Sequence, residues 1–94
     1  MIVYIIYSLA DDSYYVGYCQ ENLEERLVKH CTGFYDNSYT KKATDWQLFW
    51  HLQCSSKQQA LAIEKHIKAM KSRKYIIDLK KYPTISEKLL LKYL

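Results

Sequence analysis

The chain opens with two apolar runs separated by a short polar break. Residues 2–8 (IVYIIYS) are almost all β-branched or aromatic, which is typical of a strand with a buried centre. Residues 14–19 (YYVGYC) repeat this character after the polar stretch LADDS, so the pattern predicts an antiparallel hairpin. The sequence leaves the register of the hairpin open. If Tyr4 lies opposite Gly17, Tyr15 shares a face with Tyr4, whereas a shift of one residue separates the two tyrosines.

A first helix is predicted in the stretch ENLEERLVKHCTG. Asn22 is followed three residues later by Glu25, which resembles a capping box, and Gly33 is suited to end the helix. Arg26 and His30 are four residues apart, so they stack on one face of this helix.

The rest of the chain alternates polar and apolar segments. Residues 34–45 are polar and predict an irregular connection with at most a brief helical turn, and residues 46–54 (WQLFWHLQC) predict a third strand. In the following stretch, residues 55–74, Ser56 and Gln59 form another capping-box pair at the start of a helix.

The core face of this second helix carries apolar residues at helical spacing: Ala60, Ile63, Ile67 and Met70. Glu64 lies next to that face. The stretch KYIIDLKKY is helical in pattern, Pro83 is expected to break it, and residues 86–93 predict a short terminal helix. The expected order β-β-α-β-α-α predicts an α/β (α+β) fold, a three-stranded antiparallel sheet flanked by helices.

Composition narrows the class of protein. The 94 residues predict one domain spanning 1–94, and the formal charge of +4 is compatible with a polyanionic partner but does not demand one. The cysteines (Cys19, Cys31 and Cys54) are odd in number and lack paired spacing, which favours a reducing compartment. The first apolar run is short and follows no basic region, so we expect a soluble cytoplasmic protein with no membrane association.

Five positions, in this order, resemble the GIY-YIG nuclease superfamily, especially its small single-domain bacterial members. The residues IVY at 2–4 and YVG at 15–17 resemble the two tripeptides of the family. The helical arginine corresponds to Arg26, the residue four positions later to His30, and the acidic metal ligand to Glu64. The resemblance runs from residue 2 to about residue 80.

The resemblance implies a chemical role for each position. Glu64 would bind a single Mg²⁺ or Mn²⁺ ion, and Arg26 would brace the phosphate with its planar guanidinium. Tyr15 is the first choice for the general base, Tyr4 would orient water or phosphate, and His30 could share the task of the base. A free tyrosine titrates near 10, so a tyrosine base needs neighbouring positive charge to stabilise its phenolate.

Substrate binding is expected from the basic residues in and after the Glu64 helix. Gly17 would let its strand approach the substrate backbone closely because it lacks a Cβ. Phosphate contacts of this kind carry almost no sequence preference, so DNA that is branched, nicked or otherwise structured is the expected substrate, or a protein partner supplies the specificity. DNA repair, recombination and mobile-element processing are all open by analogy. The basic residues expected to bind the substrate are Lys65, Lys68, Lys71, Arg73 and Lys74.

Two other classes of function stay open. Ile2 replaces the glycine of the first tripeptide and the connection before Arg26 is one residue longer than usual, which allows a nucleic-acid-binding module that does not cleave. A zinc site drawn from residues such as His51 and Cys54 is less favoured, because residues three apart on a strand point to opposite faces. A protein–protein adaptor that uses exposed tyrosines or tryptophans is the blandest alternative.

Overall fold

A computed structural model describes residues 1–20, 22–32 and 39–94 of the chain. Its strands β1 (Ile2–Ser8), β2 (Ser13–Cys19) and β3 (Gln47–Gln53) form one antiparallel sheet in the order β2-β1-β3. The predicted fold class is therefore confirmed. The helices are α1 (Leu23–Cys31), α2 (Lys57–Met70), α3 (Arg73–Lys81) and α4 (Pro83–Lys92), with a 3₁₀ turn η1 (Tyr39–Lys42) before β3. The observed order is β-β-α-β-α-α-α; the predicted order β-β-α-β-α-α left out one of the three helical segments that the sequence indicates after the third strand.

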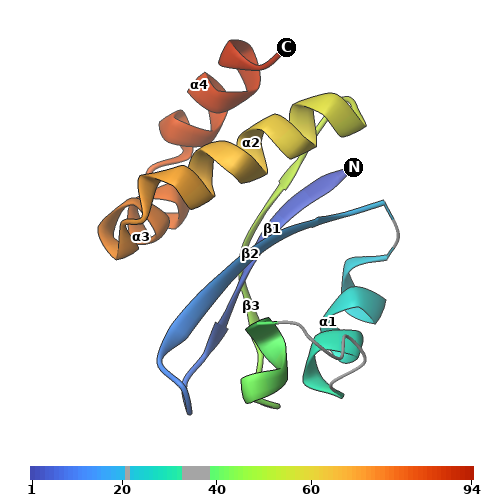
Figure 1. Cartoon of the computed structure of the whole chain (residues 1–94). Helices are drawn as coiled ribbons and strands as arrows, with labels where there is room; N and C mark the ends of the chain where they lie inside the picture. The colour runs from blue at the N-terminus through green and yellow to red at the C-terminus, as the bar shows by residue number, and fades with distance from the viewer. Residues whose placement is uncertain (21, 33–38) are drawn as a thin grey trace.

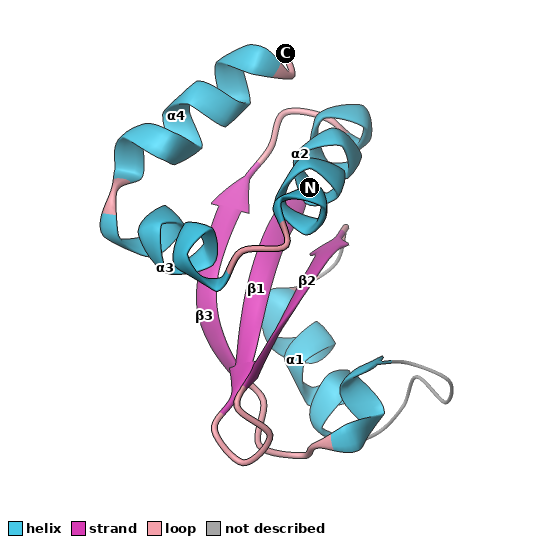
Figure 2. Ribbon diagram, turned by 60° about the vertical axis from the view of Figure 1, so that its left-hand side comes forward, coloured by secondary structure: helices cyan, strands magenta, loops and turns pink. Residues whose placement is uncertain are grey.

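The helices cover both faces of the sheet. Helices α2, α3 and α4 lie on one face, and α1 lies on the other (Figures 1 and 2). The central strand β1 is consequently buried on both sides, which explains why its sequence is apolar throughout instead of alternating with polar residues. No described helix is long and apolar enough to cross a membrane.

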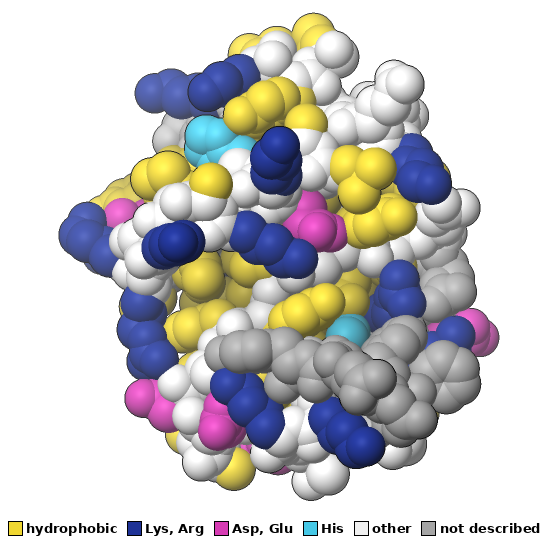
Figure 3. All heavy atoms as spheres, viewed as in Figure 1, with side chains coloured by type: hydrophobic (Ala, Val, Ile, Leu, Met, Phe, Trp, Pro, Cys, Tyr) yellow, Lys and Arg dark blue, Asp and Glu magenta, His cyan; other side chains and the backbone are white. Residues whose placement is uncertain are grey.

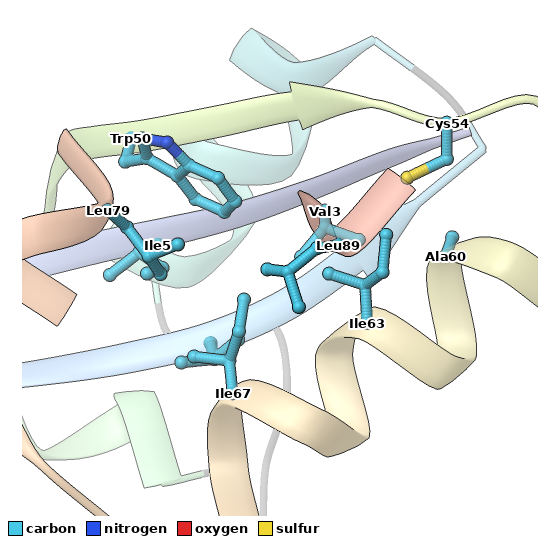
Figure 4. Close-up of a cluster of buried hydrophobic side chains, with 10 residues drawn as sticks. Val3, Ile5, Trp50, Cys54, Ala60, Ile63, Ile67, Leu79 and Leu89 are labelled. Atoms are coloured by element: carbon cyan, nitrogen blue, oxygen red, sulfur yellow. The ribbon is translucent and has the colours of Figure 1, made fainter. Parts of the chain in front are cut away.

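The main core lies between the sheet and helices α2–α4, and we call it the helix-side core (Figure 4). All three strands and all three helices contribute to it, so the sheet face and the helices exclude water from each other. Its buried members are Val3, Ile5, Val16, Trp50, Cys54, Ala60, Ile63, Ile67, Leu79 and Leu89. The second cluster, the α1-side core, contains Tyr4, Ile6, Cys19, Ala43 and Trp46.

The prediction that Met70 belongs to the core face of α2 is wrong. Its side chain is 45% exposed, while Ala60, Ile63 and Ile67 are buried as predicted. The helix ends at Met70, because Lys71 adopts a left-handed conformation with φ of 46° that turns the chain towards α3.

Strand β3 contains a β-bulge that the sequence pattern did not predict. Ile5 pairs with Trp50 and Ile6 pairs with Leu48, so Phe49 is an extra residue in the ladder. The bulge allows both Phe49 and Trp50 to pack against the helix-side core.

The predicted caps are largely confirmed. The Asn22 side chain accepts hydrogen bonds from the amides of Glu24 and Glu25, and Ser56 accepts one from Gln59. The Gln59 side-chain oxygen accepts a hydrogen bond from the amide of Ser55, one residue before the cap. The predicted helix end at Gly33 lies outside the described residues.

Pro83 does not merely break a helix; it begins one. It occupies the first residue of α4, where its missing N–H would lack a helical partner anyway. The terminal helix therefore starts at residue 83 instead of the predicted 86.

Candidate active site

The register of the β1–β2 hairpin brings Tyr4 and Tyr15 to one face. Tyr4 pairs with Gly17 and Ile6 pairs with Tyr15, which confirms the first of the two registers considered from the sequence. Both tyrosines pack in the α1-side core, with Tyr4 buried and Tyr15 partly exposed. Tyr7 and Tyr14 point to the opposite face, where their rings contact each other with centroids 4.7 Å apart.

Gly17 provides the space in which the tyrosine rings lie. A Cβ at this position would come within 2.7 Å of the Tyr4 hydroxyl oxygen, 2.8 Å of its Cζ and 3.0 Å of Cε2 of Tyr15. Any side chain here would therefore displace the rings. The sequence-based expectation placed substrate against Gly17; in the structure, the Tyr4 ring lies across this glycine.

Helix α1 carries His30 into a buried chain of hydrogen bonds. The Tyr4 hydroxyl oxygen lies 2.7 Å from Nε2 of His30, and Nδ1 of His30 lies 2.8 Å from the Thr40 hydroxyl oxygen. The indole N–H of Trp46 donates to the Thr40 carbonyl over 2.8 Å. Sequence reasoning missed Thr40, because a threonine in a polar connection carries no signal of contact with a distant helix.

His30 is neutral near pH 7. Burial lowers its pKa to about 4, and the nearby positive charge of Arg26 contributes in the same direction. A neutral imidazole donates through one nitrogen and accepts through the other, whereas the hydroxyls of Tyr4 and Thr40 can do either. The proton positions on Tyr4 and Thr40 are therefore coupled through His30.

Arg26 lies one helical turn before His30 on α1 and reaches strand β2. Its Nη2 donates to the Tyr18 carbonyl oxygen over 3.0 Å, which fixes the guanidinium beside Gly17. This bond orients a planar, permanently charged group at the same face as the tyrosines.

Glu64 comes from α2, the helix that crosses over the sheet near β2 (Figure 1). Its Oε1 lies 3.0 Å from Nζ of Lys68, and its side chain is 16% exposed. The same ammonium nitrogen lies 5.6 Å from the centroid of the Tyr15 ring. Because one cation contacts both groups, the Glu64 carboxylate lies on the Tyr15 side of α2.

The five predicted positions therefore converge, but they differ in exposure. Tyr4 and His30 are 2% and 3% exposed, so they form a floor beneath the face that was expected to be open to solvent. Tyr15, Arg26 and Glu64 are partly exposed and lie nearer the surface.

The metal-binding potential of the site rests on one carboxylate. Among the residues that the structure describes, no group of three or more His, Cys, Asp or Glu side chains is arranged to hold a metal ion. A single carboxylate suits Mg²⁺ or Mn²⁺, since such ions keep several waters. His51 is exposed on the Tyr4 side of β3 and Cys54 is buried in the helix-side core, so this zinc pair points to opposite faces as predicted.

The predicted substrate-binding cations have different surroundings. Lys65 and Lys71 are exposed, whereas Arg73 and Lys74 make ion pairs within the protein. Arg73 donates to the side chain of Asp12 over 2.9 Å and to its backbone oxygen over 2.6 Å. Lys74 contacts Asp78 over 3.1 Å, one turn along α3. Lys and Arg side chains border a hollow on this side of the molecule (Figure 3).

Comparison with known protein families identifies the class of domain. The model of the GIY-YIG catalytic domain matches residues 1–76, and all five converging positions lie within this match. The chain therefore belongs to the GIY-YIG family. The fold is thus of the nuclease type, DNA is the substrate class that such a domain implies, and the family generally uses divalent metal ions. No curated protein and no solved structure matches the chain significantly.

Proposed function

We propose that this protein is a metal-dependent endonuclease that hydrolyses phosphodiester bonds in DNA, with structure-dependent or low sequence specificity. One observation carries the proposal. Residues from β2 and α2 meet at the edge of the sheet, where the Lys68 ammonium contacts both the Glu64 carboxylate and the Tyr15 ring, and the Tyr15 ring also lies 5.2 Å from the His30 ring of α1. Phosphodiester hydrolysis needs a base, a phosphate clamp and a metal ligand, and Tyr15, Arg26 and Glu64 are the residues we propose for these three roles.

Tyr15 is the proposed general base. It is the more exposed of the two tyrosines, and the Lys68 ammonium nearby would stabilise negative charge that forms there during the reaction. Tyr4, held by His30 over 2.7 Å, would orient the water or a phosphate oxygen. Arg26 would brace the phosphate through its guanidinium, which the Tyr18 carbonyl holds in place.

Glu64 would hold the divalent cation, Mg²⁺ or Mn²⁺. When bound, the ion supplies charge neutralisation on the phosphoryl oxygens and stabilises the departing 3′ oxygen. Lys68 would then have to release the Glu64 carboxylate, since its ammonium contacts Oε1 at 3.0 Å. The Lys68 side chain is 48% exposed, so its ammonium can move into water when the ion binds.

A cleavage assay on nicked, flapped and branched DNA tests the proposal. We expect cleavage with Mn²⁺ or Mg²⁺ that disappears on chelation of the metal, and a loss of at least about 100-fold in rate in Glu64→Gln, the scale expected for removal of one transition-state-stabilising group. Glu87→Gln is the matched control, because Glu87 is exposed on α4, far from β2 along the fold.

In the same assay Tyr15→Phe should abolish cleavage, whereas Tyr4→Phe should slow it, because only Tyr15 would transfer the proton. Cleavage that survives Glu64→Gln would contradict the proposal. Metal-independent DNA binding without cleavage under any condition would instead favour the non-cleaving nucleic-acid-binding module, for which the Lys68–Glu64 ion pair is the supporting observation.

A further inference from the structure

A cleft opens beside the proposed active site, between strand β2 and the junction of α2 and α3. Its volume is about 460 Å³, which lies in the range of small-molecule sites. Figure 3 shows a hollow on this side of the molecule, with apolar side chains at its base and Lys and Arg side chains around it. The residues that matter for its chemistry are Tyr14, Ile67, Lys68, Lys71, Arg73 and Ile76.

The lining combines an apolar floor with a cationic rim. Ile67 is buried and Ile76 is partly buried, and both belong to or pack against the helix-side core. Lys68 and Lys71 are exposed on the rim. A ligand that satisfies both parts has a flat apolar group and a negative charge next to it, which is the chemistry of a nucleotide.

One wall of the cleft is already held in place. The guanidinium carbon of Arg73 lies 5.3 Å from the centroid of the Tyr14 ring, and its Nη1 donates to Asp12 over 2.9 Å. The Asp12 carboxylate also accepts from the Tyr7 hydroxyl over 2.6 Å. These contacts tie the hairpin turn to α3, so binding would not require the wall to be ordered first.

We propose that this cleft binds one unpaired nucleotide of the DNA strand adjacent to the scissile phosphate. The inference rests on the proposed endonuclease function. The base would pack on Ile76, with Ile67 beneath it in the floor, and its phosphate would meet Lys68 and Lys71. A paired base is stacked between its neighbours and cannot enter a cleft of this size, so the occupant comes from a flap, a gap or a frayed end.

The position of the cleft links this nucleotide to the chemistry. Tyr15 and Lys68 line the cleft and are also the groups next to Glu64. A nucleotide seated there would therefore deliver its neighbouring phosphate to Tyr15. The preferred substrate is a strand that becomes unpaired at the cut. The cleft would therefore select DNA by the presence of an unpaired nucleotide and not by its base sequence.

The test measures binding without metal and without cleavage, in the Glu64→Gln background. The probes are the single-stranded tetramer dT4, an abasic tetramer with the same phosphates, free thymidine monophosphate and a blunt duplex. We expect dT4 to shift the NMR signals of the Ile67 and Ile76 methyl groups. The abasic tetramer and the duplex should leave these signals in place, and thymidine monophosphate should bind more weakly than dT4.

Lys71→Asn supplies the variant, because asparagine tolerates the left-handed conformation that Lys71 adopts at φ 46°. We expect it to weaken dT4 binding by about fivefold, the scale of one exposed charge contact. Lys88→Gln removes the same charge from the exposed surface of α4 and should leave dT4 binding unchanged.

The inference would be overturned if dT4 did not shift the methyl signals of Ile67 and Ile76, or if the abasic tetramer bound as tightly as dT4. Equal affinity for thymidine monophosphate and dT4 would also overturn it, in favour of a free-nucleotide site. Cleavage activity combined with silent methyl groups would refute the cleft alone. Methyl shifts in a protein that never cleaves would refute the endonuclease and leave the cleft standing as a nucleotide site.

Discussion

At the scale of single residues, the packing around Gly17 explains why the second tripeptide contains a glycine. The position opposite Tyr4 must lack a Cβ, because the Tyr4 ring occupies that space and its hydroxyl is held by His30. The glycine of the second tripeptide therefore determines where the tyrosine of the first tripeptide lies.

Gly17→Ala should reduce the free energy of unfolding by about 1–3 kcal/mol, the usual effect of overpacking a tight site. The new methyl group would approach Cζ and the hydroxyl oxygen of Tyr4, at 2.8 and 2.7 Å. Urea unfolding of the variant measures the loss. In a Tyr4→Leu background, which lacks both of those atoms, the same substitution should cost less, because only the contact with Cε2 of Tyr15 at 3.0 Å remains; an equal loss in both backgrounds would refute this explanation.

The candidate residues could be predicted because their order along the chain resembles the motifs of the GIY-YIG family. Strand and helix patterns alone would not have singled out Tyr4, Tyr15, Arg26, His30 and Glu64. The partners that hold them were not predictable. Thr40 bonds to His30, although no sequence pattern around Thr40 predicts this contact. Outside the candidate residues, Asp45 likewise accepts a hydrogen bond from the Ser8 hydroxyl over 2.6 Å, 37 residues away.

At the scale of elements, α2 does more than cover the sheet. Its buried face, which includes Ile63 and Ile67, anchors it in the helix-side core, and Glu64 and Lys68 flank that face one turn apart. Because α2 crosses near the edge strand β2, the flanking residues reach the Tyr15 side of the sheet. The packing of α2 thus sets the position of the proposed metal ligand.

Helix α4 lies beyond the region matched by the family model, yet it belongs to the core. Leu89 is 4% exposed in the helix-side core, and the Gln59 side chain donates to the Leu90 carbonyl over 3.0 Å. The helix predictions were wrong at Met70 and at residues 83–85, the start of α4. Both places lie at the end of one helix or the start of the next. Helix boundaries depend on a single backbone dihedral, such as that of Lys71, which periodicity does not report.

Leu89→Ala should lower the free energy of unfolding by about 2–5 kcal/mol, because it removes buried methyl groups and leaves a cavity. Leu91→Ala is the matched control on the same helix; Leu91 is 71% exposed and the change should stay within about 0.5 kcal/mol. Chemical denaturation of both variants makes the comparison. A loss in Leu89→Ala no larger than that in Leu91→Ala would contradict the place of Leu89 in the core.

At the scale of the whole molecule, His30 couples stability to pH. It is buried beneath the open face and is contacted from several elements, by Tyr4 on β1, Tyr15 on β2 and Thr40 in η1, with Arg26 on its own helix. Folding keeps the imidazole neutral down to about pH 4, whereas the unfolded chain protonates it near 6.5. The unfolded state therefore binds the proton first, and stability falls as the pH drops from about 6.5 towards 4.

The wild-type protein should lose about 3 kcal/mol more than His30→Gln over this window, from the depression of the His30 pKa. His66, whose pKa is also lowered, is present in both proteins, so its contribution cancels. The carboxyl groups of Asp11, Asp12 and Asp45 have lowered pKa values and reduce stability only below about pH 4. Urea unfolding at several pH values measures the loss, and His51→Gln, a change at an exposed histidine, should keep the wild-type profile.

An NMR titration of the His30 ring gives the same quantity directly and does not depend on the stability of the variant. A midpoint near 6.5 would contradict the burial argument. It would also mean that a fraction of His30 is charged near neutral pH. The hydrogen bonds to Tyr4 and Thr40 can form with a neutral imidazole.

The sequence by itself determined the hairpin, the capped helices and the three-stranded α+β class, because each element depends on patterns within about twenty residues. The candidate residues were recognisable from the sequence through their resemblance to the family motifs. Only the tertiary structure decided the hairpin register, the Tyr4–His30–Thr40 chain, the meeting of Glu64 with Tyr15 through Lys68 and the cleft beside them. These features depend on how α1 and α2 cross the sheet. Such crossings arise from side-chain packing between distant segments, which no local periodicity encodes.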